Sequence, residues 1–258
     1  MKFTFTTICF SWIMRLFYAA QSLMGFLLGG DACIRCGSYV SAMPVCKNCR
    51  KLLLAEEHSP RCRICGKQLL GEISVCISCR ENLLLKSVDG VFPLYSYRLW
   101  KKPLLFSWKM EEKRILSPFF AELIAKKIFE LYKLFGREIP VVPVPPRPGK
   151  IRKNGWDQIS DICFYLKHRW QIKILPLLER KSVVQQKKLG RADRLSTIGQ
   201  SYAMRSDSQI EKLASKMPDT LIIIDDVLTT GSTVETCAEI LKNSGAEQVF
   251  AITLFIVD

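Results

Sequence analysis

One stretch decides the fold of this 258-residue chain: Leu221-Ile-Ile-Ile-Asp225-Asp226-Val227-Leu228-Thr229-Thr230-Gly231-Ser232-Thr233. Its apolar residues 221–224 predict a fully buried strand that ends in two adjacent carboxylates. A loop rich in hydroxyl groups follows, and then a helical pattern over residues 233–243 that Gly245 closes. The order of strand, loop and helix predicts an α/β fold with its ligand site at the carboxyl end of the strand.

The same stretch has the chemistry to bind a ribose 5-phosphate group. Backbone N–H groups at the start of a helix favour an anion, and Gly231 lets the backbone approach a phosphate closely. Asp225 and Asp226 can accept hydrogen bonds from the 2- and 3-hydroxyls of a ribose. Further hydroxyl donors are Thr229, Thr230, Ser232 and Thr233. The alternative is an ordinary strand, loop and helix with a capping Ser or Thr, but a match of this length is far more specific than that.

Residues 91–258 continue the alternation of strands and helices. Ser117 and Pro118 suit the N-cap and the first position of a helix that Gly136 ends. A second helix is expected around residues 159–166. Strands are expected at residues 139–144, 172–175, 221–224 and 249–257. This pattern predicts a mostly parallel sheet with helices on both faces, and residues 81–90 resemble a linker that precedes it.

The N-terminal part is dominated by cysteine. Eight of the eleven cysteines form four C-x-x-C pairs, and the second two pairs repeat the pattern of the first two. Each half of the repeat has C-x-x-C-Gly first and C-x-x-C-Arg second. The eight residues are Cys33, Cys36, Cys46, Cys49, Cys62, Cys65, Cys76 and Cys79.

Two residues between cysteines allow a tight turn that directs both sulfurs at one metal ion, and two such turns complete a tetrahedral four-sulfur site. We therefore expect one or two structural Zn²⁺ ions. The repeat favours one site per half, while a cross-braced arrangement remains an alternative. Disulfides are disfavoured because no clear secretory signal is present, and thiol ligands are typical of a reducing, cytoplasmic location.

Residues 1–30 are mostly apolar and carry only Lys2 and Arg15 as charges before Asp31. Gln21, Ser22 and several glycines interrupt the run, which is too broken for the roughly 20 apolar residues of a spanning helix. We expect a short apolar helix that packs on the body of the protein and no membrane-spanning segment. A role at the membrane surface is the alternative.

The net charge is +14, from 38 Lys and Arg against 24 Asp and Glu. An excess of this size indicates an acidic partner, which is a nucleic acid, a phosphate compound or an anionic membrane. A soluble protein with a basic surface is the simpler alternative. Trp100, Trp108 and Trp170 stand near Lys and Arg residues and could stack on bases of single-stranded DNA, although core packing is the commoner role of tryptophan.

The stretch 221–233 resembles the signature with which type I phosphoribosyltransferases bind 5-phosphoribosyl 1-pyrophosphate (PRPP). The run Val142-Pro143-Val144-Pro145, followed by Arg152-Lys153-Asn154-Gly155-Trp156-Asp157-Gln158, is similar to a motif of the ComF competence-protein family. Gln186, Leu189 and Arg194 also fit that family, although Trp156 and Asp157 stand where it commonly has Phe and Asn. The likeness covers roughly residues 20–258, including the cysteine repeat.

The resemblance implies an α/β, type I phosphoribosyltransferase-like parallel sheet flanked by helices and preceded by a small zinc-ribbon module. It divides the chain into an apolar segment (1–30), a double zinc ribbon (31–82) and a phosphoribosyltransferase-like domain (91–258). It implies Mg²⁺ with PRPP, bound by Asp225, Asp226, Val227 and the loop that follows. It further implies a pyrophosphate loop and a basic segment near the site. The pyrophosphate loop contains Pro145, Pro146 and Arg147. The basic segment contains Lys187, Lys188, Arg191 and Arg194.

Three functions follow from the resemblance. The chain is a phosphoribosyltransferase with an unidentified acceptor, or a factor that handles single-stranded DNA in the cytoplasm during natural transformation, or a PRPP-sensing scaffold without turnover. Asp225 and Asp226 are the expected catalytic residues. Single-stranded DNA and a competence helicase are the expected macromolecular partners.

Overall fold

The computed structural model describes residues 31–40, 44–55, 60–97, 101–181, 201–206 and 217–257. The predicted apolar segment 1–30 lies outside these residues, as do Trp100, Lys187, Lys188, Arg191 and Arg194. No helix in the described ranges combines the length and the apolar character that a membrane crossing requires.

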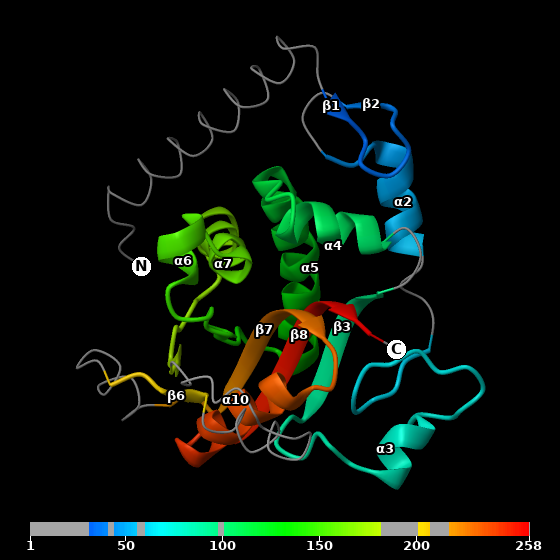
Figure 1. The fold of residues 1–258 in the computed structure, drawn as a ribbon. Coiled ribbons are helices and arrows are strands. Elements are labelled where there is room, and N and C mark those ends of the chain that lie inside the picture. The colour runs from blue at the N-terminus through cyan, green and yellow to red at the C-terminus, as the bar shows by residue number, and fades with distance from the viewer. Residues whose placement is uncertain are drawn as a thin grey trace, which may run out of the picture.

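A parallel sheet of four strands forms the centre of the protein (Figure 1). Its order is β3 (Gly90–Ser96), β8 (Gln248–Ile256), β7 (Thr220–Leu228) and β4 (Val141–Pro143). The predicted parallel sheet is thereby confirmed. The strand β7 is longer than predicted, because its pairing with β8 continues past Asp225, opposite Thr253, to Leu228, opposite Ile256.

The residues of β7 alternate between two separate cores. Ile222 and Ile224 pack with α5 (Ser117–Phe135) and α7 (Gln158–Trp170) on one face of the sheet. Leu221 and Ile223 pack with α10 (Ser232–Asn243) on the other face. A strand that is buried on both faces must be apolar at every position, which explains the unbroken run of leucine and isoleucine.

The edge next to β4 is extended by the predicted strand 172–175, which is reduced to one bridge. Ile174 pairs with Val141 in parallel, while the Val141 N–H donates to the Lys173 carbonyl and Leu175 N–H donates to the Val141 carbonyl. After β4, the Val144 N–H donates to the Ile224 carbonyl at 3.1 Å, so the chain leaves the sheet directly beside Asp225.

The start of α5 differs from the prediction. Its N-cap is Leu116, the last residue of the 3₁₀ turn η2 (Arg114–Leu116), so Ser117 is already helical and Pro118 follows it. The Ser117 hydroxyl instead accepts a hydrogen bond of 2.9 Å from Trp108 Nε1 inside the core. The predicted end is confirmed, because Gly136 adopts the left-handed conformation after the last turn.

Trp108 therefore belongs to the core and offers no surface for stacking bases. It is fully buried in α4 (Lys101–Lys109), where it contacts Phe120. Trp170 is half-buried and lies beneath the guanidinium of Arg169, 4.8 Å from its ring centre. The alternative considered in the sequence analysis, that tryptophan serves core packing, is thus confirmed for Trp108.

The two cysteine modules lie on opposite faces of the sheet and well apart (Figure 1). The first contains β1 (Asp31–Ala32), β2 (Tyr39–Val40) and α2 (Lys47–Ala55), and its Arg50 forms an ion pair with Glu122 of α5. The second contains α3 (Ile77–Glu81) and joins the core beside α10. Each module thus belongs to a different core of the protein.

The second module covers the edge strand β3. Arg61 Nη1 donates to the Gly66 carbonyl at 2.9 Å, and Nη2 lies 3.5 Å from the carbonyl oxygen of Leu94 in β3. Gly66 packs so closely on Pro93 that a Cβ atom there would lie 2.2 Å from Pro93 Cδ. Covering an edge strand in this way protects its unpaired backbone groups from association with other chains.

Residues 82–89, within the segment that resembled a linker, pack on the sheet domain. Leu85 and Val88 are buried in the same core as α10. Asp89 accepts a hydrogen bond of 2.7 Å from the Val249 N–H and forms an ion pair with Lys242. The segment therefore fixes the second module to the domain at several points.

The docking of the second module can be tested with two equivalent glycines. Gly37 and Gly66 follow the second cysteine of each module, with φ angles of 73° and 74°. Gly37→Ala should cost about 1–2 kcal/mol for the left-handed conformation alone. Gly66→Ala should cost roughly a further 1–3 kcal/mol, because the added Cβ meets Pro93 and the Val91 carbonyl, whereas Gly37 has open space among the described residues. Urea unfolding of the zinc-loaded proteins measures both losses, and equal losses would contradict the docking.

Candidate functional site

A cavity of about 950 Å³ opens at the carboxyl ends of β7 and β4. Its walls come from five parts of the chain: the end of α4, residues 144–154, the start of α7, the end of β7 with the loop after it, and the hairpin of β5 (Leu178–Arg180) and β6 (Tyr202–Met204). This is where open α/β sheets bind their ligands.

The cavity brings together most of the residues singled out in the sequence. Asp225, Asp226, Val227, Thr229 and Thr233 line it. Thr230, Gly231 and Ser232 belong to the same loop but do not line the cavity. Residues of the predicted pyrophosphate loop, namely Pro145, Pro146 and Arg147, line the same cavity. Two motifs that are far apart in the sequence therefore face one space.

Cations outnumber acids around this cavity. Among the residues that the structure describes, the basic ones at the cavity are Lys109, Arg147, Lys150, Arg152 and Arg180, and the acids are Asp157, Asp225 and Asp226. A concave surface with this excess of positive charge attracts a polyanion such as a pyrophosphate ester.

Lys109 is held against the acids at the end of β7. Its Nζ atom lies 2.5 Å from Asp226 Oδ2, and both side chains are partly buried. The position of Lys109 depends on the core, since it follows the buried Trp108 in the last turn of α4. The hydrogen bond between Trp108 and Ser117 thus orients a cation of the cavity.

Asp225 is the most perturbed acid of the site. Burial raises its pKa to about 7, and the neighbouring negative charge of Asp226 contributes to the shift. Its Oδ1 accepts a hydrogen bond of 2.8 Å from the Asp226 N–H. Without a ligand, ionised Asp225 is therefore unfavourable, and a cationic or hydrogen-bond-donating ligand would favour its charged form.

Asp157, which stands where the related family commonly has Asn, is compensated within the protein. It is the N-cap of α7: Oδ2 accepts hydrogen bonds from the Ser160 N–H at 3.0 Å and from the Ser160 hydroxyl at 3.1 Å. Lys150 Nζ lies 2.7 Å from Oδ1. The acid is thus used to cap a helix and to hold Lys150 at the cavity.

Lys150, Arg180 and Tyr202 line the cavity but were not assigned to it from the sequence. Arg180 lies over the ring of Tyr202, 5.2 Å from its centre, because β5 and β6 pair in an antiparallel hairpin. Burial raises the pKa of the Tyr202 hydroxyl. Two strands this short, and this far apart in the chain, leave no periodic signal by which their pairing could have been predicted.

Contacts with α10 and with Leu85 hold the loop 229–233, which we call the ligand loop. Gly231 is the N-cap of α10 and adopts φ 82°, and its carbonyl accepts a hydrogen bond from the Glu235 N–H at 2.9 Å. The Thr230 and Ser232 hydroxyl oxygens lie 2.6 Å apart. Gly231 itself is covered by Leu85, since a Cβ atom at this position would lie 2.8 Å from Leu85 Cδ2.

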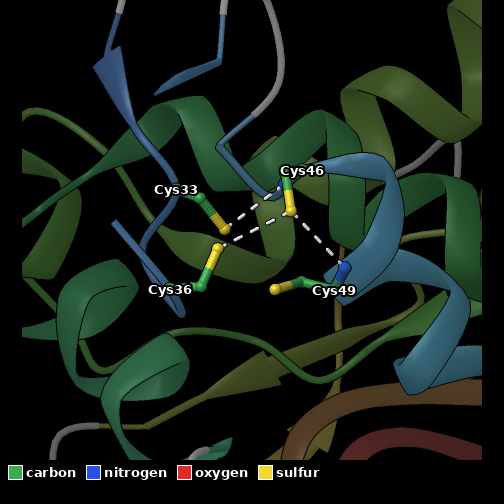
Figure 2. A group of neighbouring side chains, drawn as sticks. All are labelled: Cys33, Cys36, Cys46 and Cys49. Carbon is green, nitrogen blue, oxygen red and sulfur yellow. Dashed lines mark hydrogen bonds between the residues drawn. The ribbon is translucent and has the colours of Figure 1, made fainter. Parts of the chain in front are cut away.

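The eight paired cysteines form two separate groups, each of which could bind a zinc ion. Cys33, Cys36, Cys46 and Cys49 make the first group (Figure 2). Cys62, Cys65, Cys76 and Cys79 make the second. The sulfurs in each group lie within 4.8 Å of one another, so each half of the repeat closes its own group, and the cross-braced alternative is excluded.

The spacing of the sulfurs fits a tetrahedral Zn²⁺ site. Cys36 and Cys46 are 3.7 Å apart at their sulfurs, and Cys65 and Cys76 have the same separation. Four sulfurs at about 2.3 Å from one Zn²⁺ lie about 3.8 Å from each other. The Cys76 N–H points to Cys62 Sγ, as the Cys46 N–H does to Cys33 Sγ. Backbone donors of this kind stabilise thiolates, the form that binds metal.

Comparison with known proteins shows what the C-terminal part of the chain is similar to. Residues 180–257, from the last residue of β5 to the residue after β8, match the family described as phosphoribosyl transferase domain. This range includes β7, the ligand loop and α10, which carry the acids and the loop of the cavity. This part of the protein is thus similar to a phosphoribosyl transferase domain.

A curated relative gives a more particular likeness. The chain is 24% identical to competence protein ComFC of Streptococcus pneumoniae (strain ATCC BAA-255 / R6) over 215 residues, which is 81% of this chain and 86% of the relative. The resemblance to the ComF family that the motifs predicted is thereby confirmed. The two cysteine groups fit the zinc-ribbon module expected with it.

The raised pKa of Asp225 predicts a gain in stability when its charge is removed. Its folded-state pKa, about 7, exceeds the ordinary value of 3.8, so the cost of its ionisation to the stability of the fold grows as the pH rises from 3.8 to about 7 and levels off above that. Asp225→Asn keeps an oxygen acceptor for the Asp226 N–H. It should raise the Tm of the ligand-free protein by about 2–4 °C at about pH 8, the shift expected for ~1 kcal/mol, and by less at about pH 6.

Asp219→Asn is the control for this measurement, because its side chain is exposed just before β7. It should give no gain that grows with pH. A Tm gain for Asp225→Asn that stays constant or shrinks between the two pH values would contradict the raised pKa.

Proposed function

We propose that this protein binds PRPP, together with Mg²⁺, in the cavity at the ends of β7 and β4. The observation that carries the proposal is the meeting of two loops in one space. The paired acids, Thr229 and Thr233 of the ligand loop and the predicted pyrophosphate loop line one cavity, together with five cations among the described residues. One ligand with a phosphate at one end, a ribose in the middle and a pyrophosphate at the other end matches that order.

Each part of PRPP has a complementary part of the site. The ligand loop and the start of α10 would hold the 5-phosphate, since helix N-termini favour anions. Asp225 and Asp226 would accept hydrogen bonds from the ribose hydroxyls. Residues 145–147 would hold the pyrophosphate with their backbone, assisted by Lys150 and Arg152. The site would thereby stretch the ligand from one loop to the other, across the carboxylates.

The chemistry supported by this arrangement is cleavage of the bond between C1 and the pyrophosphate. Positive charge develops on the ribose ring as the bond breaks, and negative charge develops on the leaving group. The carboxylates stabilise the former, and the basic residues of the cavity stabilise the latter. Mg²⁺, a hard cation suited to carboxylate and phosphate oxygens, would neutralise part of the pyrophosphate charge.

The binding proposal is tested by Asp225→Asn combined with Asp226→Asn. Charge-assisted hydrogen bonds contribute about 1.5–3 kcal/mol each, so losing both should weaken PRPP binding by about 100-fold or more. Calorimetric titration with PRPP and Mg²⁺ measures the change, and the zinc content should stay the same. The matched control is Glu239→Gln with Glu247→Gln, which removes two exposed acids outside the cavity. Equal PRPP affinity of the double cavity variant and this control would refute the site assignment.

The ComFC relative supports a second function for the same protein. That relative is named as a competence protein. We infer that the present chain acts in the cytoplasm on single-stranded DNA during natural transformation, with a competence helicase as partner. The charge of +14 favours binding to nucleic acid. The buried position of Trp108 removes one of the three tryptophans considered for base stacking.

Pyrophosphate release separates these functions. We expect release from PRPP and Mg²⁺ to be stimulated by one member of a panel of nucleobases, amines and single-stranded DNA, which would establish a phosphoribosyltransferase and name its acceptor. Binding of DNA should weaken steeply as the salt concentration rises. PRPP binding without release under any condition, and without DNA binding, would instead make the protein a non-catalytic PRPP sensor.

A further inference from the structure

We propose that the second cysteine module braces the ligand loop through Leu85 and Ser87, so that ligand binding depends on metal in the second cysteine group and not in the first. The identity of the ligand, PRPP, rests on the proposed function. The brace itself rests on the contacts of Leu85 and Ser87, which do not line the cavity.

Leu85 supports the loop at its most constrained residue. Gly231 is buried and left-handed, and it does not line the cavity. The Leu85 side chain is only 5% exposed and occupies the space where a Gly231 Cβ would stand. A glycine at this position therefore serves the close approach of Leu85 as well as the left-handed turn. While Leu85 stays in place, its side chain prevents Gly231 from moving towards residues 82–89.

Ser87 supports the first turn of α10. Its N–H donates a hydrogen bond of 2.8 Å to Glu235 Oε1, and the Glu235 N–H in turn donates to the Gly231 carbonyl. Glu235 Oε2 is buried, and in the described part of the chain it has no hydrogen-bond partner. A carboxylate near a helix N-terminus is favoured by the helix dipole, but losing its one neighbouring donor would leave it poorly solvated. The turn is thus sensitive to displacement of Ser87.

The brace is continuous with the second cysteine group. The helix α3 begins directly after Cys76 and ends at Glu81, shortly before the segment reaches Leu85. Cys62, Cys65 and Cys76 share one apolar cluster with Leu85, and also with Leu228 and Val234, which flank the ligand loop. Metal binding contributes folding energy to small four-sulfur modules, so metal loss should release this segment.

The first cysteine group has no such connection among the described residues. Cys33 and Cys49 belong to the cluster on the other face of the sheet, with α5 and α7. Metal loss from the first group should loosen contacts such as the ion pair between Arg50 and Glu122. It should leave the contact between Leu85 and Gly231 intact. The two groups are similar in sequence and geometry, which makes one a matched control for the other.

The first test is Leu85→Ala, with Leu84→Ala as control, because the Leu84 side chain is 55% exposed. Hydrogen exchange of peptides that cover residues 228–236 should become faster in Leu85→Ala and not in Leu84→Ala. PRPP affinity should fall about tenfold in Leu85→Ala, which corresponds to about 1.4 kcal/mol. Zinc content should be unchanged in both. Wild-type exchange and wild-type affinity in Leu85→Ala would overturn the proposal.

The second test compares two double variants of the full chain. One combines Cys62→Ser and Cys65→Ser, and the other combines Cys33→Ser and Cys36→Ser. The first pair should weaken PRPP binding and speed exchange of the ligand loop, whereas the second pair should do neither. By thermodynamic reciprocity, PRPP should raise the zinc affinity of the second group alone, measured as the chelator concentration that removes half of its zinc at equilibrium. Equal effects of the two cysteine pairs on the ligand loop would overturn the specific role of the second group.

These outcomes are separable from failure of the proposed function. If wild-type protein binds no PRPP, the proposed function fails, while the hydrogen-exchange comparison still decides whether Leu85 and the second group brace the loop. If wild-type protein binds PRPP and the Leu85 and cysteine variants leave loop exchange unchanged, the brace fails and the function stands.

Discussion

The position of β7, paired in parallel between β8 and β4, is the constraint on which the rest of the structure depends. Both faces of this strand are buried, so residues 221–224 must be apolar, and each buried Leu or Ile side chain contributes about 1.5–3 kcal/mol. Polar side chains can emerge only where the strand leaves the core. Asp225 and Asp226 stand at that point, and the loop that joins the strand to α10 follows soon after them.

The two faces of the sheet serve different parts of the site. On one face, the core of α5 and α4 fixes Trp108 and thereby places Lys109 beside Asp226. On the other face, α10 and residues 82–89 hold the ligand loop. Because each cysteine module joins one of these cores, the modules are parts of the domain's own packing. This arrangement explains why two repeats of similar sequence can have different consequences for the cavity.

The charges in the cavity lower the stability of the ligand-free protein. Burial and the charge of Asp226 disfavour ionised Asp225, and Lys109 compensates only part of that effect. A carboxylate whose charged form is unfavourable in the ligand-free protein is typical of functional clefts. The same reasoning explains Asp157, whose burial is tolerated because Ser160 and Lys150 satisfy its oxygens.

The sequence predicted those features that depend on local patterns. The apolar run before Asp225, the left-handed Gly136 and the C-x-x-C spacing each have a direct physical cause, and their structures follow. Features that depend on distant contacts were missed. Ser117 matched the chemistry of an N-cap, but Trp108 uses its hydroxyl in the core. Residues 82–89 resembled a linker because the partners of Leu85 and Asp89 lie near the other end of the chain. Arg180 and Tyr202 meet through the antiparallel pairing of two three-residue strands that lie far apart in the chain.

The most direct test of the account is a competition titration of the wild-type protein. PRPP with Mg²⁺ should bind with one site per chain. Ribose 5-phosphate and pyrophosphate should each displace it, because the ligand loop and the loop at residues 145–147 would hold the two ends of one ligand separately. Absence of PRPP binding, or binding that neither fragment displaces, would contradict the assignment of the cavity.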